Sequence, residues 1–139
     1  MHVDGQSLLT YYVDMNLISQ KSAPPFTAGG TSITGYAAPS RGAKAVSLWR
    51  IELAPGTVSP LHEMDVEEVF LGIDGSAVAE IDGRQTTVAA GDCLILPAAT
   101  PFTLTAGPDR PFQAVACMPA GGRATMLPDG ATFVPPWAE

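Results

Sequence analysis

The imidazole of His62 and the carboxylate of Glu68, six positions apart, are the groups of this chain best suited to acid–base chemistry. Burial would raise the pKa of Glu68, and a nearby carboxylate would raise the pKa of His62, so the pair could share a proton near neutral pH. Such a pair can act as general acid and general base. It can equally serve as an orienting hydrogen bond in a binding site, and a lone histidine is often only a satisfied strand residue.

Other reactive residue types have weaker surroundings. Cys93 and Cys117 fall on expected strands, where a thiol is more often a small hydrophobic residue than a nucleophile. Ser59 and Ser76 have no catalytic motif around them, and strand alternation points Glu67 outward into solvent. The sequence therefore gives little support to nucleophilic catalysis.

The spacing around His62 resembles the first of two signature motifs of the cupin family, and a later stretch resembles the second. The first motif is Gly, five residues, His-x-His, three or four residues, Glu, six residues and Gly; its positions are held here by Gly56, His62, Met64, Glu68 and Gly75. The second is Gly, five residues, Pro-x-Gly, two residues, His, three residues and Asn; its positions are held by Gly91, Pro97, Ala99, Phe102 and Ala106. The chain is thus similar to a small single-domain cupin with degenerate metal-binding motifs.

The substitutions bear on cofactor chemistry, because cupins of the usual type hold a divalent metal with three imidazoles and one carboxylate. Here Met64 and Phe102 replace two of the three histidines. A thioether suits Cu(I) and is poor for harder ions, and phenylalanine offers no donor atom. With only His62 and Glu68 as firm ligands, we expect neither a metal nor another cofactor.

The resemblance implies that the motif side chains line one cavity inside the barrel. We expect His62 and Glu68 to be catalytic there, and five apolar side chains to shape the substrate: Trp49, Met64, Phe70, Phe102 and Leu104. These features predict a metal-independent enzyme, an isomerase, dehydratase or cyclase of the kind found in specialised metabolism, that acts on a largely apolar small molecule. A non-catalytic binding cupin, or a metal-dependent cupin with an unusual ligand set, is the alternative.

Composition limits the partners. The 139 residues suffice for one domain, and a net charge of −7 with 15% charged residues disfavours nucleic acid and anionic membranes. No apolar stretch approaches a membrane span and no basic and apolar leader opens the chain, so we expect a cytoplasmic protein. Two cysteines fit a reducing compartment, with a disulfide the less favoured alternative.

The elements that must position the site are strands, because 14 glycines and 13 prolines punctuate short apolar runs. In residues 43–53 the apolar side chains alternate, and in residues 76–88 two short runs flank Asp82-Gly83, a type I′ hairpin signal. Together with the resemblance, this predicts an all-β jelly roll, a double-stranded β-helix of two packed antiparallel sheets. We place its core barrel at residues 43–118, with an arm at 1–42 and a tail at 119–139.

The flanking segments and the outer surface are harder to interpret. We expect residues 7–18 to form a short helix or an edge strand, residues 22–30 to be loop, and Phe133 and Trp137 of the tail to pack on the barrel exterior. Val69, Leu71 and Ile73 make the outer face of one strand apolar. A strand that is apolar on both faces is covered on both faces, which predicts a homodimer or a cover formed by the N-terminal segment.

Overall fold

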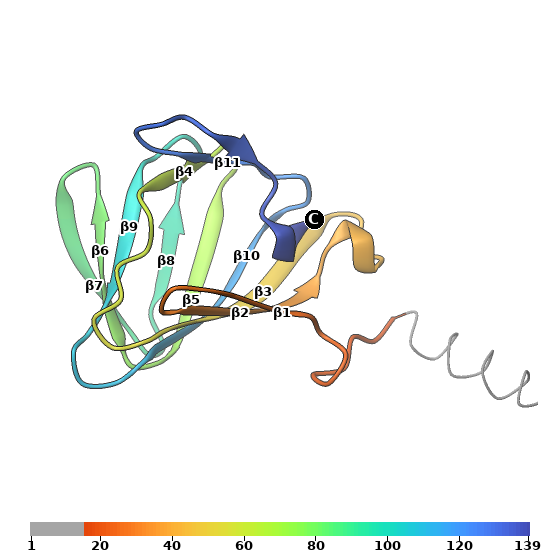
Figure 1. Ribbon diagram of the computed structural model, residues 1–139, viewed down its shortest axis with the longest axis horizontal. Helices are drawn as coiled ribbons and strands as arrows, with labels where there is room; N and C mark the ends of the chain where they lie inside the picture. The colour runs from red at the N-terminus through yellow and green to blue at the C-terminus, as the bar shows by residue number, and fades with distance from the viewer. Residues whose placement is uncertain (1–15) are drawn as a thin grey trace, which may run out of the picture.

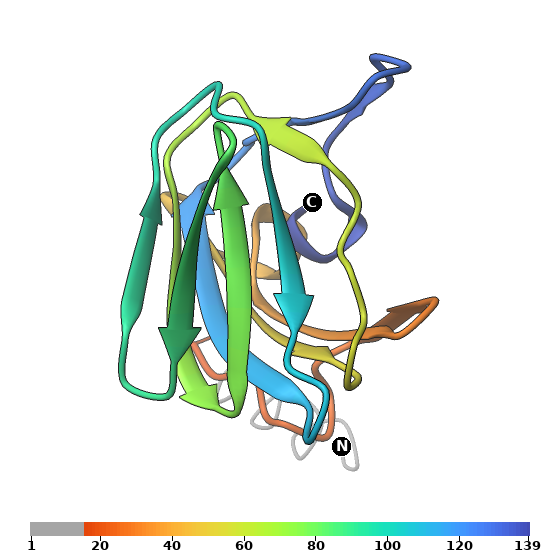
Figure 2. The same ribbon diagram turned by 90° about the vertical axis from the view of Figure 1, so that its left-hand side faces the viewer.

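A computed structural model describes residues 16–139 and places two six-stranded antiparallel sheets face to face (Figure 1). Sheet A has the strand order β1-β2-β3-β10-β5-β8, and sheet B the order β12-β11-β4-β9-β6-β7. Figure 2 shows β6, β7 and β9 of sheet B in front, with sheet A behind them. The predicted all-β fold of two packed sheets is therefore confirmed.

Strands alternate between the two sheets along much of the chain. Their bounds are β1 (Pro25–Ala28), β2 (Thr31–Ala37), β3 (Val46–Leu53), β4 (His62–Met64), β5 (Glu68–Asp74), β6 (Ser76–Ile81), β7 (Arg84–Ala89), β8 (Cys93–Leu96), β9 (Phe102–Ala106), β10 (Phe112–Pro119), β11 (Ala124–Met126) and β12 (Thr132–Phe133). Two short 3-10 helices complete the fold, η1 (Pro39–Arg41) and η2 (Pro136–Ala138).

The inner face of sheet A follows from the period of two in the sequence. On β3, Ser47, Trp49, Ile51 and Leu53 are buried and alternate with more exposed residues, as predicted. In β10, the inward Ala116 pairs with Trp49 on one side and with Phe70 of β5 on the other. Because alanine is small, the central strand leaves space between these two large side chains.

The predicted hairpin is confirmed. Asp82 and Gly83 both have positive φ angles, 51° and 77°, between β6 and β7, as a type I′ turn requires. Ala99, which holds the second glycine position of the second motif, is exposed in the turn before β9. It adopts a left-handed φ of 59° there, so it adds no space inside the barrel.

Both flanking segments contain strands, and one of these strands lies where a loop was expected. Residues 22–30 were predicted to be loop, yet β1 lies within them and pairs with β2. Pro25 is tolerated because it begins an edge strand, where its missing N–H costs little. In the tail, β11 and β12 extend sheet B.

The prediction for residues 7–18 concerns mostly residues outside the described part of the chain. Its last three residues, 16–18, are described and form no helix or strand. Within residues 16–139, no helix is long and apolar enough to span a bilayer.

Candidate functional site

An apolar cavity of about 180 Å³ opens between the two sheets. The seven residues named from the sequence as catalytic or substrate-shaping all line this cavity: Trp49, His62, Met64, Glu68, Phe70, Phe102 and Leu104. They come from both sheets, from β3 and β5 of sheet A and from β4 and β9 of sheet B. The structure thus brings the predicted site together, while the roles of its residues remain predictions.

His62 is held by contacts from its own strand and from the neighbouring one. It pairs in register with Phe102 of β9, whose ring centroid lies 4.6 Å from that of the imidazole. Nδ1 lies 2.8 Å from the carbonyl oxygen of Pro60 and donates a hydrogen bond to it, which leaves Nε2 as an acceptor in the neutral ring. Burial lowers the pKa of His62, and the bond to Pro60 opposes this only in part.

Glu68 begins β5 and points inward, with only 4% of its surface exposed. Burial raises the pKa of its carboxyl to about 8, because the charged form would lose its hydration. Its Oε1 atom is buried and has no hydrogen-bond partner among residues 16–139. At neutral pH the side chain is therefore mostly a protonated acid with unused hydrogen-bonding capacity.

These environments correct one expectation about the pair. The sequence predicts that a carboxylate raises the pKa of His62, but burial lowers it, and the described residues show no hydrogen bond between His62 and Glu68. The reason is that a buried carboxyl that keeps its proton provides no negative charge to stabilise an imidazolium. The cavity therefore contains a neutral base and a neutral acid.

The tail supplies cavity residues that were expected on the exterior of the barrel. Phe133 and Trp137 line the cavity instead of packing outside the barrel. Figure 1 shows the reason: after β11 the chain descends from sheet B toward η2, above β2 and β3 of sheet A. The proline and aromatic residues of the tail were the available sign that it packs against the barrel. The sequence does not show that the tail crosses from one sheet to the other, and this crossing turns Phe133 and Trp137 toward the cavity.

The donor atoms do not fit the metal of a usual cupin. In the described part of the chain, no three His, Cys, Asp or Glu residues gather closely enough to hold a metal ion. At the motif positions, Met64 is buried beside the cavity and Phe102 packs on His62. The two firm ligands that remain, His62 and Glu68, fall short of what a divalent ion requires.

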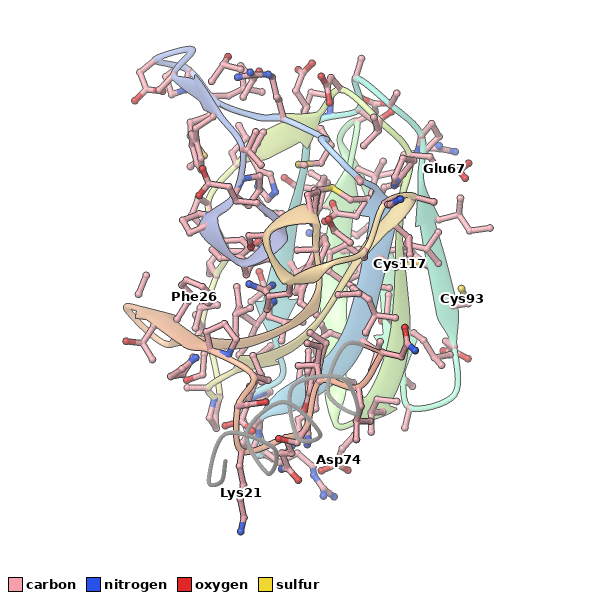
Figure 3. The ribbon with its side chains drawn as sticks, turned by 90° about the vertical axis from the view of Figure 1, so that its right-hand side faces the viewer. Lys21, Phe26, Glu67, Asp74, Cys93 and Cys117 are labelled. Carbon is pink, nitrogen blue, oxygen red and sulfur yellow. The ribbon has the colours of Figure 1, made fainter. Side chains whose placement is uncertain are left out.

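Both cysteines lie away from the cavity. Cys93 on β8 and Cys117 on β10 are free thiols and carry side chains on the outer side of sheet A (Figure 3). Cys93 is exposed, whereas the sequence favoured a small hydrophobic residue within a strand. Its outward direction follows from alternation with the buried Leu94 and Leu96.

Two antiparallel sheets that enclose an apolar cavity define a jelly-roll barrel. The sequence comparison makes the class specific: residues 49–118 match the cupin domain family, and this chain belongs to that family. No curated protein sequence matches the chain.

Solved structures with the same fold carry varied activities. The polyketide cyclase RemF from Streptomyces resistomycificus superposes with a TM-score of 0.70 at 16% identity, over 86% of each chain. A sugar phosphate isomerase of the cupin superfamily from Silicibacter pomeroyi gives 0.65 at 16% identity, over 84% of this chain and 90% of that one. Oxalate decarboxylase from Bacillus subtilis gives 0.66 at 20% identity, over 75% of this chain and 29% of its own. At such identities the likeness shows the fold alone.

Proposed function

We propose that this protein is a metal-independent enzyme that isomerises, dehydrates or cyclises an uncharged and largely apolar small molecule. The observation that carries the proposal is that a protonated Glu68 and a neutral His62 line the same apolar cavity. Groups whose pKa values are moved apart in this way are suited to act as acid and base at the same pH.

In the proposed reaction, each group moves one proton. Nε2 of His62 accepts a proton from a carbon or hydroxyl of the substrate, and the Glu68 carboxyl donates a proton to the substrate oxygen on which negative charge develops. In isomerisation, the imidazolium of His62 returns its proton to another carbon of the enol, and the Glu68 carboxylate takes its own proton back from the enol oxygen. In cyclisation, the carbon that loses its proton to His62 attacks a carbonyl carbon of the same molecule while Glu68 protonates the oxygen of that carbonyl. In dehydration, a carbon loses its proton to His62 while the neighbouring hydroxyl, protonated by Glu68, leaves as water. After cyclisation or dehydration, proton exchange with solvent returns both side chains to their starting states.

The cavity lining supports a neutral substrate. Among residues 16–139, neither lysine nor arginine lines the cavity, so a phosphate group would lie there without a counter-charge. This disfavours a substrate like that of the sugar phosphate isomerase and favours one of the polyketide type, as for the cyclase of the same fold. The cavity could hold a folded chain or a bicyclic ring system.

The test compares variants on the small-molecule extract of the cells that make this protein, with mass spectrometry to find the compound consumed. We expect His62→Ala and Glu68→Gln to slow its conversion by about 10²–10⁴-fold, the usual effect of losing a general acid or base. Glu67→Gln, which changes the exposed carboxylate beside Glu68, is the matched control and should react at the wild-type rate. In heavy water, an isomerised product should contain deuterium at the carbon that His62 reprotonates.

The pH dependence of kcat/KM gives a second test. The rate should rise with pH as His62 loses its proton, below the ordinary pKa of 6.5, and fall as Glu68 loses its proton near pH 8. If both polar variants retain wild-type turnover while Phe102→Ala is slow, cavity shape rather than proton transfer drives the reaction. A compound that is retained by the protein but never converted would instead indicate a non-catalytic binding cupin.

A further inference from the structure

The end of the tail is fixed to β3 of sheet A and to η1. The Ser47 hydroxyl donates to the carbonyl oxygen of Ala138 at 2.9 Å, and Nη2 of Arg41 donates to that of Trp137 at 2.6 Å. Further back, β11 is paired with β4 of sheet B. Because the segment is anchored to both sheets, Trp137 holds a defined position in the cavity wall.

Aromatic neighbours fix the Trp137 ring. Its centroid lies 6.5 Å from that of Trp49, on the cavity side, and 6.2 Å from that of Phe26 in an edge-to-face arrangement. Figure 3 shows Phe26 on β1, at the edge of the molecule where sheet A ends. The backbone anchors and these ring contacts together predict a side chain that is preorganised rather than free to rotate.

The indole N–H of Trp137 is nevertheless unsatisfied. Nε1 is buried and makes no hydrogen bond to any residue in the range 16–139, and the only other such side-chain atom there is Oε1 of Glu68. Both residues line the same cavity. A buried donor without a partner costs free energy, so two orphaned polar atoms on residues that line one cavity point to polar atoms of a ligand.

We propose that Trp137 is a specificity-determining residue whose indole N–H donates a hydrogen bond to a carbonyl or ether oxygen of an uncharged, ring-containing ligand. The ligand packs against the aromatic wall that includes Trp49, and Glu68 is the second polar contact. Trp137 lies outside residues 49–118, so the matched family segment does not contain it. The inference rests on the part of the proposed function that puts a small molecule in this cavity, and does not need catalysis.

The test uses two bicyclic probes that differ by one acceptor, 1-tetralone and its parent hydrocarbon tetralin, titrated by calorimetry into the full chain. Wild-type protein should bind both and prefer the ketone. Trp137→Phe keeps an aromatic ring but removes the N–H. It should therefore lower the affinity for 1-tetralone roughly five- to tenfold and the affinity for tetralin less than about twofold. Equal weakening of both probes would mean that Trp137 only packs, and unchanged affinities would mean that its N–H is not used; either result overturns the proposal.

A second measurement needs no substitution at Trp137 and covers the case in which Trp137→Phe fails to fold. The chain has two tryptophans, so an ¹⁵N spectrum contains two indole N–H signals, which a Trp49→Phe sample assigns. Saturation with 1-tetralone should move the Trp137 signal downfield, and tetralin should not. A Trp137 signal unmoved by the ketone, or absence of binding of either probe, would overturn the inference. The outcome is separate from turnover, because neither the affinity for 1-tetralone nor the shift of the Trp137 signal depends on conversion of the probe.

Discussion

At the scale of single residues, the most unusual group is the Glu68 carboxyl. Among residues 16–139 no cation offsets its burial, and this burial raises its pKa to about 8. A buried ionised carboxylate without a partner is costly, so the side chain keeps its proton in the folded protein. Evolution could remove this cost with an amide or an apolar residue, which makes a role for an acid in this position the simplest explanation of its presence.

The burial of Glu68 has a consequence for stability. The folded-state pKa of about 8 lies above the ordinary 4.5, so the folded protein holds a proton that the unfolded chain releases as pH rises. The stabilisation is complete below pH 4.5 and is lost as pH rises toward and through 8. The free energy of unfolding of Glu68→Gln should therefore rise relative to that of the wild type as pH increases. The change from acid pH to pH 9 should reach about 5 kcal/mol.

Urea denaturation of the two proteins at pH 5, 7 and 9 measures this difference. Comparison with Glu68→Gln cancels the contribution of His62, whose lowered pKa acts in the opposite direction at acid pH. Glu67→Gln is again the control and should follow the wild type. A difference that does not change with pH would mean that Glu68 is ionised in the folded protein.

At the scale of elements, the turns decide how closely the strands approach each other. Gly75 and Gly83 both have positive φ angles, 71° and 77°, and both lie at strand ends. Their surroundings differ: a Cβ atom on Gly75 would lie 2.2 Å from the carbonyl oxygen of Pro111, while one on Gly83 would meet nothing within 4 Å. The glycine that ends the first motif is thus required by both conformation and space.

This contrast predicts unequal effects of the same substitution. Gly83→Ala should cost about 1–2 kcal/mol, the strain of a left-handed residue with a side chain. Gly75→Ala should cost at least about 2 kcal/mol more, because backbone atoms of the Pro111 loop must also move. Thermal and urea unfolding of the two variants test this prediction. Equal decreases in the free energy of unfolding would show that the loop before β10 moves at little cost.

At the scale of the whole molecule, the outer face of sheet A carries an apolar patch over β5 and β8. Leu71, Ile73 and Ile95 are 43%, 47% and 58% exposed, and Val69 lies between them in register with Ile95. The described N-terminal segment, residues 16–42, leaves them uncovered. We propose that a second copy of the chain covers this face, since so large an apolar patch is unusual on a monomer.

Substitution at the centre of this patch tests the assembly. The wild type should be a dimer by light scattering at micromolar concentration, and Leu71→Glu should shift it to a monomer because an unpaired carboxylate would be buried in the interface. Val78→Glu alters a similarly exposed residue, 37% exposed, on the outer face of sheet B and should leave the dimer intact. A monomeric wild type would contradict the proposal.

Much of the fold was accessible from the chain alone. The period of two on β3 and β5 and the Asp82-Gly83 turn are local consequences of side-chain type, so pattern reasoning identifies them. The resemblance to the two cupin motifs also indicates residues of the cavity, because the motif positions of that family point into the barrel. His62, Glu68 and Phe102 are therefore identified by the motif positions they hold.

Only the tertiary structure decided the protonation states of the cavity residues and the position of Trp137. The protonation states of His62 and Glu68 depend on how completely water is excluded, and spacing along the chain does not contain that information. The inward position of Trp137 depends on hydrogen bonds from residues about 90 positions earlier, such as Ser47 to Ala138, and on the crossing from one sheet to the other. Local patterns fix a strand and its faces, but the burial of a charge or of an indole N–H is a property of long-range packing, because only the assembled sheets remove the water.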